Sequence, residues 1–153
     1  TYAALLRRLK PLLREDAGEG FIALHWSVCR GQLLLKEDSA IMLSPAMYAD
    51  FIRPCNERLF AEFDGGGLHF CGCGDHLREV MLPTAGLQCL DLGQPEMNDV
   101  PAWREELQAR GIGLMRQRCE AVELPAVRQM WPTGSSLWTP AASQREAVAV
   151  LDA

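Results

Sequence analysis

The sequence has no apolar run near the roughly 20 residues of a membrane-spanning helix, and its N-terminus lacks the residue order of a signal peptide. Basic residues are in the minority, with 15 Lys and Arg against 20 Asp and Glu, and they are scattered along the chain. The net charge of −5 gives nucleic acid no basic surface to bind. The composition therefore predicts a cytoplasmic protein that binds neither membrane nor nucleic acid.

The Cys-x-x-Cys spacing of dithiol redox enzymes is also missing, since Cys71 and Cys73 are separated by one residue. A chain that is 48% hydrophobic can build a core without the disulfide framework of small secreted proteins. We therefore expect reduced thiols, some of which bind metal. The cysteines are Cys29, Cys55, Cys71, Cys73, Cys89 and Cys119.

The length of 153 residues fits one domain, which we place at residues 1–153. A complete eight-fold βα barrel needs about 250 residues, so a chain of this length accounts for only part of such a barrel. The first residue is Thr1 rather than Met, which we interpret as the start of a truncated or excised piece.

Short β-like runs alternate with helices that have clear start residues, a pattern typical of α/β proteins with parallel strands. We expect helices to begin at Ser44-Pro45, with a kink at Pro54, and at Asp75, Asp99, Pro125 and Ser143. The predicted strands are Phe21 to Val28, Gly31 to Leu35, Leu68 to Cys71, Leu87 to Leu92, Ile112 to Gln117 and Ser135 to Thr139.

His69 and Cys71 end one of these strands, and alternation along a strand projects both side chains to the same side. An imidazole nitrogen and a thiolate are two of the ligands that zinc prefers. Cys119 follows a later strand and is the candidate third ligand, whereas Cys89 sits too early in its strand. The alternative is an inert core thiol beside a hydrogen-bonded histidine.

Polar residues in the strand-end loops are the other site candidates. Asp38, Ser39 and Glu96 are candidate catalytic groups, because a loop on the reactive face can present them to a polar substrate. Gly72, Gly74 and Gln94 are candidate substrate-binding residues, because backbone amides at a helix start can hold an anionic group. Solvated loops and a structural glycine turn are the alternatives, and we favour the turn.

Five segments resemble, in order and spacing, the C-terminal half of the uroporphyrinogen decarboxylase superfamily over roughly residues 36–153. The most specific are the Ser-Pro helix start with the later Pro54 and the His-x-Cys-Gly strand end. The segments are Asp38-Ser39 to Ser44-Pro45-Ala46-Met47-Tyr48, Phe51-Ile52-Arg53-Pro54, Leu68-His69-Phe70-Cys71-Gly72, Gly93-Gln94-Pro95-Glu96 and Pro132-Thr133-Gly134.

This resemblance implies an α/β fold that forms a partial (half) TIM-type (β/α) barrel with parallel strands and outer helices. It implies a methyltransferase linked to a corrinoid methyl donor, with zinc held by His69 and Cys71. The third zinc cysteine of that branch corresponds to Ser135 or Ser136 here, so Cys119 would have to replace it. The alternatives are cofactor-free decarboxylation of uroporphyrinogen or another polycarboxylate, and a half-barrel without catalysis.

A half-barrel leaves two strand edges and an apolar inner face uncovered. We therefore expect a homodimer, or a partner that completes the barrel, in addition to a small-molecule substrate.

Overall fold

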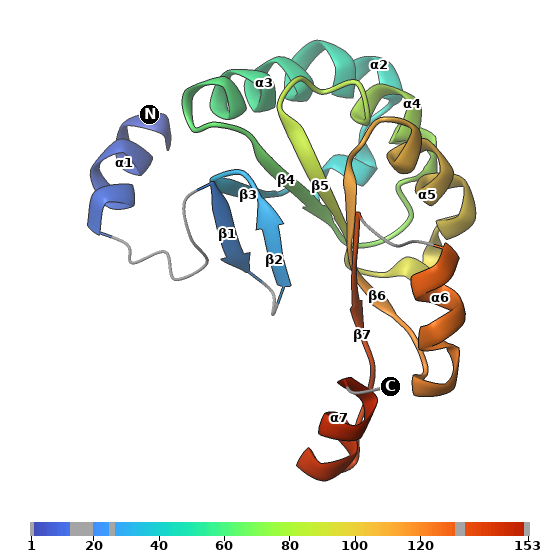
Figure 1. Ribbon diagram of the computed structural model, residues 1–153. Helices are drawn as coiled ribbons and strands as arrows, with labels where there is room; N and C mark the ends of the chain where they lie inside the picture. Colours follow the sequence, from blue (N-terminus) through green and yellow to red (C-terminus); the bar gives the residue numbers. More distant parts are fainter. Residues whose placement is uncertain (1, 13–19, 25–26, 131–133, 152–153) are drawn as a thin grey trace.

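A sheet of five parallel strands forms the centre of the protein (Figure 1). The computed structural model describes residues 2–12, 20–24, 27–130 and 134–151. Each strand of the sheet pairs with the next one along the chain, in the order β3-β4-β5-β6-β7. The bounds are Leu33–Lys36 for β3, Gly66–Phe70 for β4, Leu87–Leu92 for β5, Gly113–Arg118 for β6 and Ser135–Trp138 for β7.

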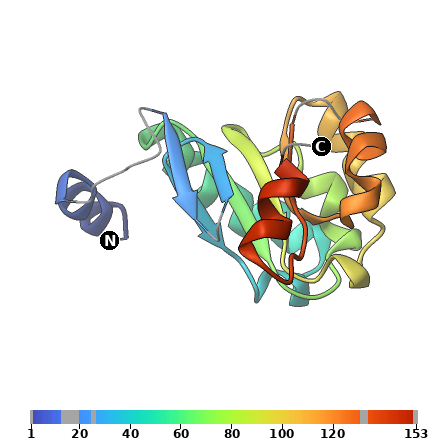
Figure 2. The ribbon, with the colours of Figure 1, turned by 60° about the horizontal axis from the view of Figure 1, so that its bottom comes forward.

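Helices α2 to α6 cover one side of this sheet, while α1 and α7 lie at its edges (Figures 1 and 2). The parallel α/β prediction is confirmed, with five strands. The α-helices are α1 Tyr2–Leu9, α2 Pro45–Met47, α3 Arg53–Glu62, α4 Arg78–Met81, α5 Val100–Ala109, α6 Leu124–Met130 and α7 Gln144–Leu151. Single 3-10 turns are Lys10–Leu12, Ala40–Met42, Asp75–Leu77, Pro95–Met97 and Ala121–Glu123.

The two faces of the sheet have different chemistry, because successive side chains of a strand point to opposite faces. One face packs under the helices and forms the main core. The other carries His69, Cys89, Asp91 and Met115, all buried. The helix-facing core includes Leu68, Phe70, Leu90, Leu92 and Leu114 from strands and Phe60, Met81, Trp103 and Leu107 from helices.

The chain from Phe21 to Arg30 forms an antiparallel hairpin, with β1 at Phe21–Leu24 and β2 at Ser27–Arg30. The prediction of one continuous strand from Phe21 to Val28 is therefore wrong. A run of apolar residues has no periodicity that distinguishes one buried strand from two paired ones. The hairpin lies beside the sheet on the side away from the helices (Figure 2).

The helix predicted at Ser44-Pro45 begins there, and Ser44 Oγ accepts a hydrogen bond of 3.2 Å from the Met47 amide. A π turn from Tyr48 to Ile52, termed η3, then leads into α3. Pro54 in the first turn of α3 has no amide hydrogen to donate backward, and π turns are a common way to absorb such a break. The predicted irregularity is confirmed and lies just before Pro54.

Two other details differ from the prediction. Strand β4 begins at Gly66, two residues earlier than predicted. Glycine at position 67 allows close packing here, because a β carbon would lie 2.6 Å from Cys89 Sγ. The helical segment after β4 begins at Asp75 as predicted, but the expectation that the Asp75 side chain caps it is wrong. Its carboxylate instead accepts hydrogen bonds of 3.0 Å from the Asp99 amide and 2.7 Å from Trp103 Nε1, which ties two strand-end loops together.

The remaining predicted elements are present, with bounds within two residues of the prediction. β5 has the predicted bounds, and Asp99 caps α5 by accepting from the Ala102 amide at 3.1 Å. Pro132 and Thr133 lie outside the described residues. None of the described helices is long and apolar enough to cross a membrane.

A half-buried carboxyl joins the end of β3 to the helical layer. Glu37 accepts hydrogen bonds of 2.8 Å from the Tyr48 hydroxyl and 2.6 Å from Asn56 Nδ2. Burial raises the pKa of the Glu37 carboxyl, and these two hydrogen bonds only partly offset the effect.

This pKa shift predicts a pH dependence of stability. Glu37 holds its proton to a higher pH when folded than when unfolded, so its contribution is complete below the unfolded pKa of about 4.3 and is lost as pH rises through the folded pKa. Glu37→Gln should therefore lose less stability than the wild type as pH rises from about 4 to 7. Urea unfolding across this range measures the difference, with exposed Glu79→Gln as control. Equal slopes for wild type and Glu37→Gln would contradict the prediction.

Candidate metal site

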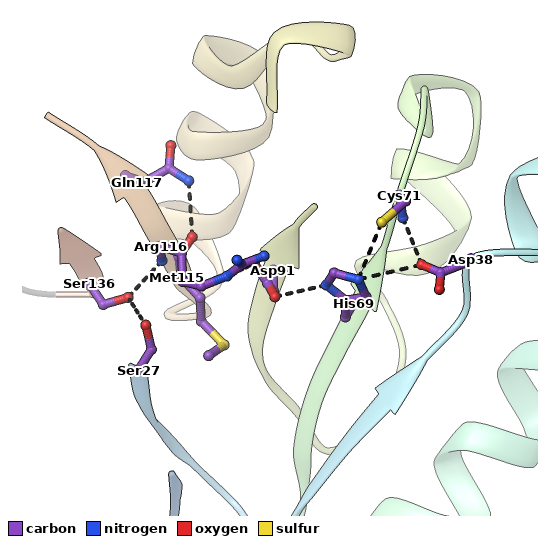
Figure 3. Close-up of polar contacts among 9 residues, drawn as sticks. All are labelled: Ser27, Asp38, His69, Cys71, Asp91, Met115, Arg116, Gln117 and Ser136. Carbon is purple, nitrogen blue, oxygen red and sulfur yellow. Dashed lines mark hydrogen bonds and ion pairs between the residues drawn. The ribbon is translucent and has the colours of Figure 1, made fainter. Parts of the chain in front are cut away.

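Three potential ligand atoms meet where β3 and β4 end (Figure 3). His69 lies near the end of β4, Cys71 follows it, and Asp38 lies in the turn after β3. His69 Nε2 is 3.5 Å from Cys71 Sγ and 3.4 Å from Asp38 Oδ1, and the three ligand atoms lie within 4.8 Å of one another. The prediction that His69 and Cys71 project to the same side is confirmed.

These spacings suit a tetrahedral ion. Two ligand atoms at 2.0–2.3 Å from such an ion lie roughly 3.3–3.8 Å apart, which the distances from Nε2 match. Nitrogen, sulfur and carboxylate oxygen are all ligands of zinc. His69 is buried, Cys71 is half-buried and Asp38 is exposed, so the group opens to solvent at its Asp38 side.

Asp91 fixes the orientation of the imidazole. It lies in register with His69 on the neighbouring strand β5, is fully buried, and its Oδ2 is 2.8 Å from His69 Nδ1. An ionised carboxylate only accepts hydrogen bonds, so Nδ1 is the ring nitrogen that donates to it. Nε2 is thereby directed toward Asp38 and Cys71, in the carboxylate–histidine arrangement common behind metal-binding histidines.

A backbone irregularity in β6 brings Arg116 to the same carboxylate. Between Leu114 and Gln117 the pairing with β7 shifts, and Arg116 has a left-handed φ of 52°. Its Nε and Nη2 each donate to Asp91 Oδ1 at 2.8 Å. Such bulges commonly redirect a side chain near a functional site. Ser136 Oγ stabilises this one by accepting from the Arg116 amide at 2.7 Å.

The charge distribution favours a cation between Asp38 and Cys71. Burial and then the neighbouring Asp38 carboxylate raise the pKa of the Cys71 thiol. Asp38 Oδ1 and Cys71 Sγ are both electron-rich and both face Nε2, so this side of the ring suits a metal cation.

Removal of the Asp38 charge should therefore activate Cys71 in metal-free protein. In Asp38→Asn the pKa of the thiol falls toward its ordinary value, and we expect Cys71 to be alkylated roughly threefold faster or more at pH 7, because the thiolate is the nucleophile. Mass spectrometry of iodoacetamide-labelled peptides measures the rate, with exposed Cys73 as an internal reference. An unchanged ratio of Cys71 to Cys73 labelling would show that Asp38 does not control the thiol.

Gly93 leaves space beside the candidate metal ligands, because glycine has no side chain. A β carbon on Gly93 would lie 2.6 Å from Cys71 Sγ and 2.9 Å from His69 Cε1. Glycine at this position therefore allows the loop after β5 to pass directly behind the candidate ligands.

Cys119 does not join the three ligand atoms that the described residues bring together. It is buried, its thiol is 3.4 Å from the Glu120 carbonyl, and it lines a separate cavity of about 500 Å³ with Arg104 and Val122. Asp38 occupies the place in the group that sequence reasoning gave to Cys119.

The other predicted site residues lie around the group without joining it. Ser39 and Glu96 are exposed in the loops after β3 and β5, and Gln94 is half-buried. Gly72 has a φ of 90°, as the structural turn requires, and the Gly74 amide donates to Asn98 Oδ1 at 2.8 Å. A side chain of the protein therefore already occupies that amide.

Sequence analysis did not predict three residues that support the candidate site through hydrogen bonds. They are Asp91, Arg116 and Asn98. Asp91 could have been found, because it lies near the end of a correctly predicted strand that neighbours His69. Asn98 also donates to the Gly72 carbonyl at 2.8 Å, a contact that no spacing predicts. Arg116 depends on a bulge that changes the alternation of β6.

Comparison with protein-family models, with curated proteins and with solved structures gives no match for this chain.

Proposed function

We propose that this chain is the zinc-binding part of a methyltransferase that resembles the uroporphyrinogen decarboxylase superfamily and transfers a methyl group from a corrinoid to a thiol. The observation that carries the proposal is the convergence of His69 Nε2, Cys71 Sγ and an Asp38 carboxylate oxygen within 4.8 Å at the carboxyl ends of parallel strands. Reactive groups of (β/α) barrels lie at this edge.

The order of the strands supports the barrel part of the proposal. Five parallel strands in sequential order, with helices on one side, are the arrangement expected of a barrel segment. A doubly wound sheet would reverse its strand order at a switch point. Missing strands, from a second copy or a partner, would pair with the two edge strands β3 and β7 to complete the barrel.

Asp38 replaces the third cysteine of the superfamily pattern in this proposal. Three protein ligands and one open position are the usual arrangement of a catalytic zinc site. Of the two serines at the position of the missing cysteine, Ser135 and Ser136, Ser136 is instead engaged with the Arg116 amide and, at 3.2 Å, with Ser27 Oγ. The proposed protein ligands of zinc are therefore one nitrogen, one sulfur and one oxygen.

Each residue then has a defined role. Zinc held here would supply the positive charge that keeps a thiol acceptor in its thiolate form near neutral pH. Asp91 keeps the proton on His69 Nδ1, so that Nε2 is presented as a ligand. Arg116 balances the buried charge of Asp91, and the exposed Asp38 leaves one side of the group open to an acceptor.

The reaction moves a methyl group from cobalt to sulfur. The cobalt–carbon bond breaks with its electron pair left on cobalt, the carbon–sulfur bond forms, and the thiol proton goes to solvent. The test is to incubate zinc-loaded protein with methylcobalamin and a small thiol, and to follow the cobalamin spectrum and the thioether by mass spectrometry.

We expect a rate at least about tenfold above the same protein without zinc, equivalent to about 1.4 kcal/mol of the barrier. Cys71→Ser should fall to the zinc-free rate, and Cys73→Ser should retain the wild-type rate. Zinc-loaded protein that forms no thioether above the zinc-free rate would overturn the methyltransferase proposal.

A further inference from the structure

A second pair of chemically reactive side chains lies on the same face of the sheet, at the end opposite the metal site. Cys29 of the hairpin strand β2 and Cys89 of β5 are both buried and pack in one cluster with Met115. Strand β2 contacts β4, β5 and β6, so the hairpin covers this part of the sheet. The two thiols are 60 residues apart in the sequence.

Both thiols belong to the same packed cluster and interact with each other. The Sγ of Cys89 also lies 4.0 Å from the Arg30 carbonyl. From the other side, Gly67 leaves the space that Cys89 Sγ occupies, since a β carbon there would be 2.6 Å away. Cys89 therefore points from the sheet toward the hairpin.

The pair can be reached from solvent. A cavity of about 650 Å³ is lined by both cysteines together with Arg30, Val28 and Met115. The exposed Arg30 places a positive charge at this cavity, which suits a small anionic reagent.

We propose that Cys29 and Cys89 form a redox-active dithiol, which an anionic low-molecular-weight disulfide oxidises to an intramolecular disulfide that joins the hairpin to the sheet. This inference is independent of the metal site.

The two thiols have different roles in the exchange. Contact with Cys89 lowers the pKa of the Cys29 thiol, while the pKa of Cys89 is raised by the same contact and by burial. Cys29 is also the residue next to the exposed Arg30 on β2, which lines the same cavity, so we assign Cys29 as the attacking thiolate. It forms a mixed disulfide and expels one thiolate. Cys89 then loses its proton to solvent, attacks the Cys29 sulfur and expels the second thiolate. Two protein thiols are oxidised and one external disulfide is reduced to two thiols.

The test uses the full chain and oxidised glutathione. After exposure, remaining thiols are alkylated under denaturing conditions and the digest is analysed by mass spectrometry. We expect wild-type protein to lose two of its six thiols and to yield one linked peptide pair containing Cys29 and Cys89. The oxidised protein should also unfold at a higher urea concentration, because the bond restricts the unfolded chain.

Single variants separate the two steps. Cys89→Ser should stop at the mixed disulfide, with one glutathione on Cys29, whereas Cys29→Ser should keep Cys89 reduced. Exposed Cys55→Ser is the matched control and should behave like the wild type. Six free thiols after exposure of wild-type protein, or a linked pair that involves other cysteines, would overturn the proposal without any variant having to fold.

Discussion

Replacement of Cys71 by serine is expected to weaken zinc binding by more than about 100-fold, since even the loss of an indirect partner of a metal ligand costs about 10–100-fold. A serine hydroxyl keeps its proton near neutral pH, so the variant lacks the sulfur, 3.5 Å from His69 Nε2, that zinc would bind as a thiolate. Competition with a chromophoric chelator measures the affinity at fixed pH.

Cys73→Ser is the matched control for this experiment. Cys73 lies two residues further on, is exposed, and does not belong to the group of ligand atoms. It should bind zinc with wild-type affinity. Equal affinity of the Cys71→Ser and wild-type proteins would remove Cys71 from the site, and with it the chemistry proposed for this chain.

Arg116→Ala is expected to lower the free energy of unfolding by about 3 kcal/mol, because it leaves the buried carboxylate of Asp91 without its cationic partner. Asp91 is fully buried, and the substitution removes both 2.8 Å contacts to its Oδ1. Alanine also retains the left-handed backbone strain at this position. Urea unfolding at neutral pH measures the loss.

Two further variants test whether the destabilisation comes from the loss of the positive charge beside Asp91. Arg116→Gly removes the same charge but tolerates positive φ, so it should be roughly 1 kcal/mol less destabilised than Arg116→Ala. Arg7 pairs with Glu62 at an exposed position, and Arg7→Ala should cost less than about 1 kcal/mol. An Arg116→Ala loss no larger than that of Arg7→Ala would mean that the guanidinium does not balance Asp91.

Helices and strands whose ends are set by contacts within a few residues were predictable from the sequence. The bounds of β5, the caps at Ser44 and Asp99 and the irregularity near Pro54 depend on contacts within a few residues, so the local pattern was sufficient. The same holds for His69 and Cys71, because alternation along a single strand places both side chains on one face.

The division of the chain from Phe21 to Arg30 into a hairpin was not predictable in this way. Its apolar run satisfies either one strand or two, and the pairing of β1 with β2 decides between them. The prediction of Cys119 as the third metal ligand was also wrong. It was based on the position of Cys119 after a parallel strand, which does not give its distance from His69 and Cys71. The turn after β3 brings Asp38 to the site instead.

The sequence by itself determined the parallel α/β character, the strand-end position of His69 and Cys71, and the helix starts, because all of these follow from periodicity and capping. Only the tertiary structure decided that Asp91 and Arg116 support His69, that Asp38 lies beside Cys71, and that Cys29 meets Cys89. The physical reason is that these contacts join residues 22 to 60 positions apart. Their distances depend on strand register, one bulge and the packing of the hairpin, none of which a local pattern encodes.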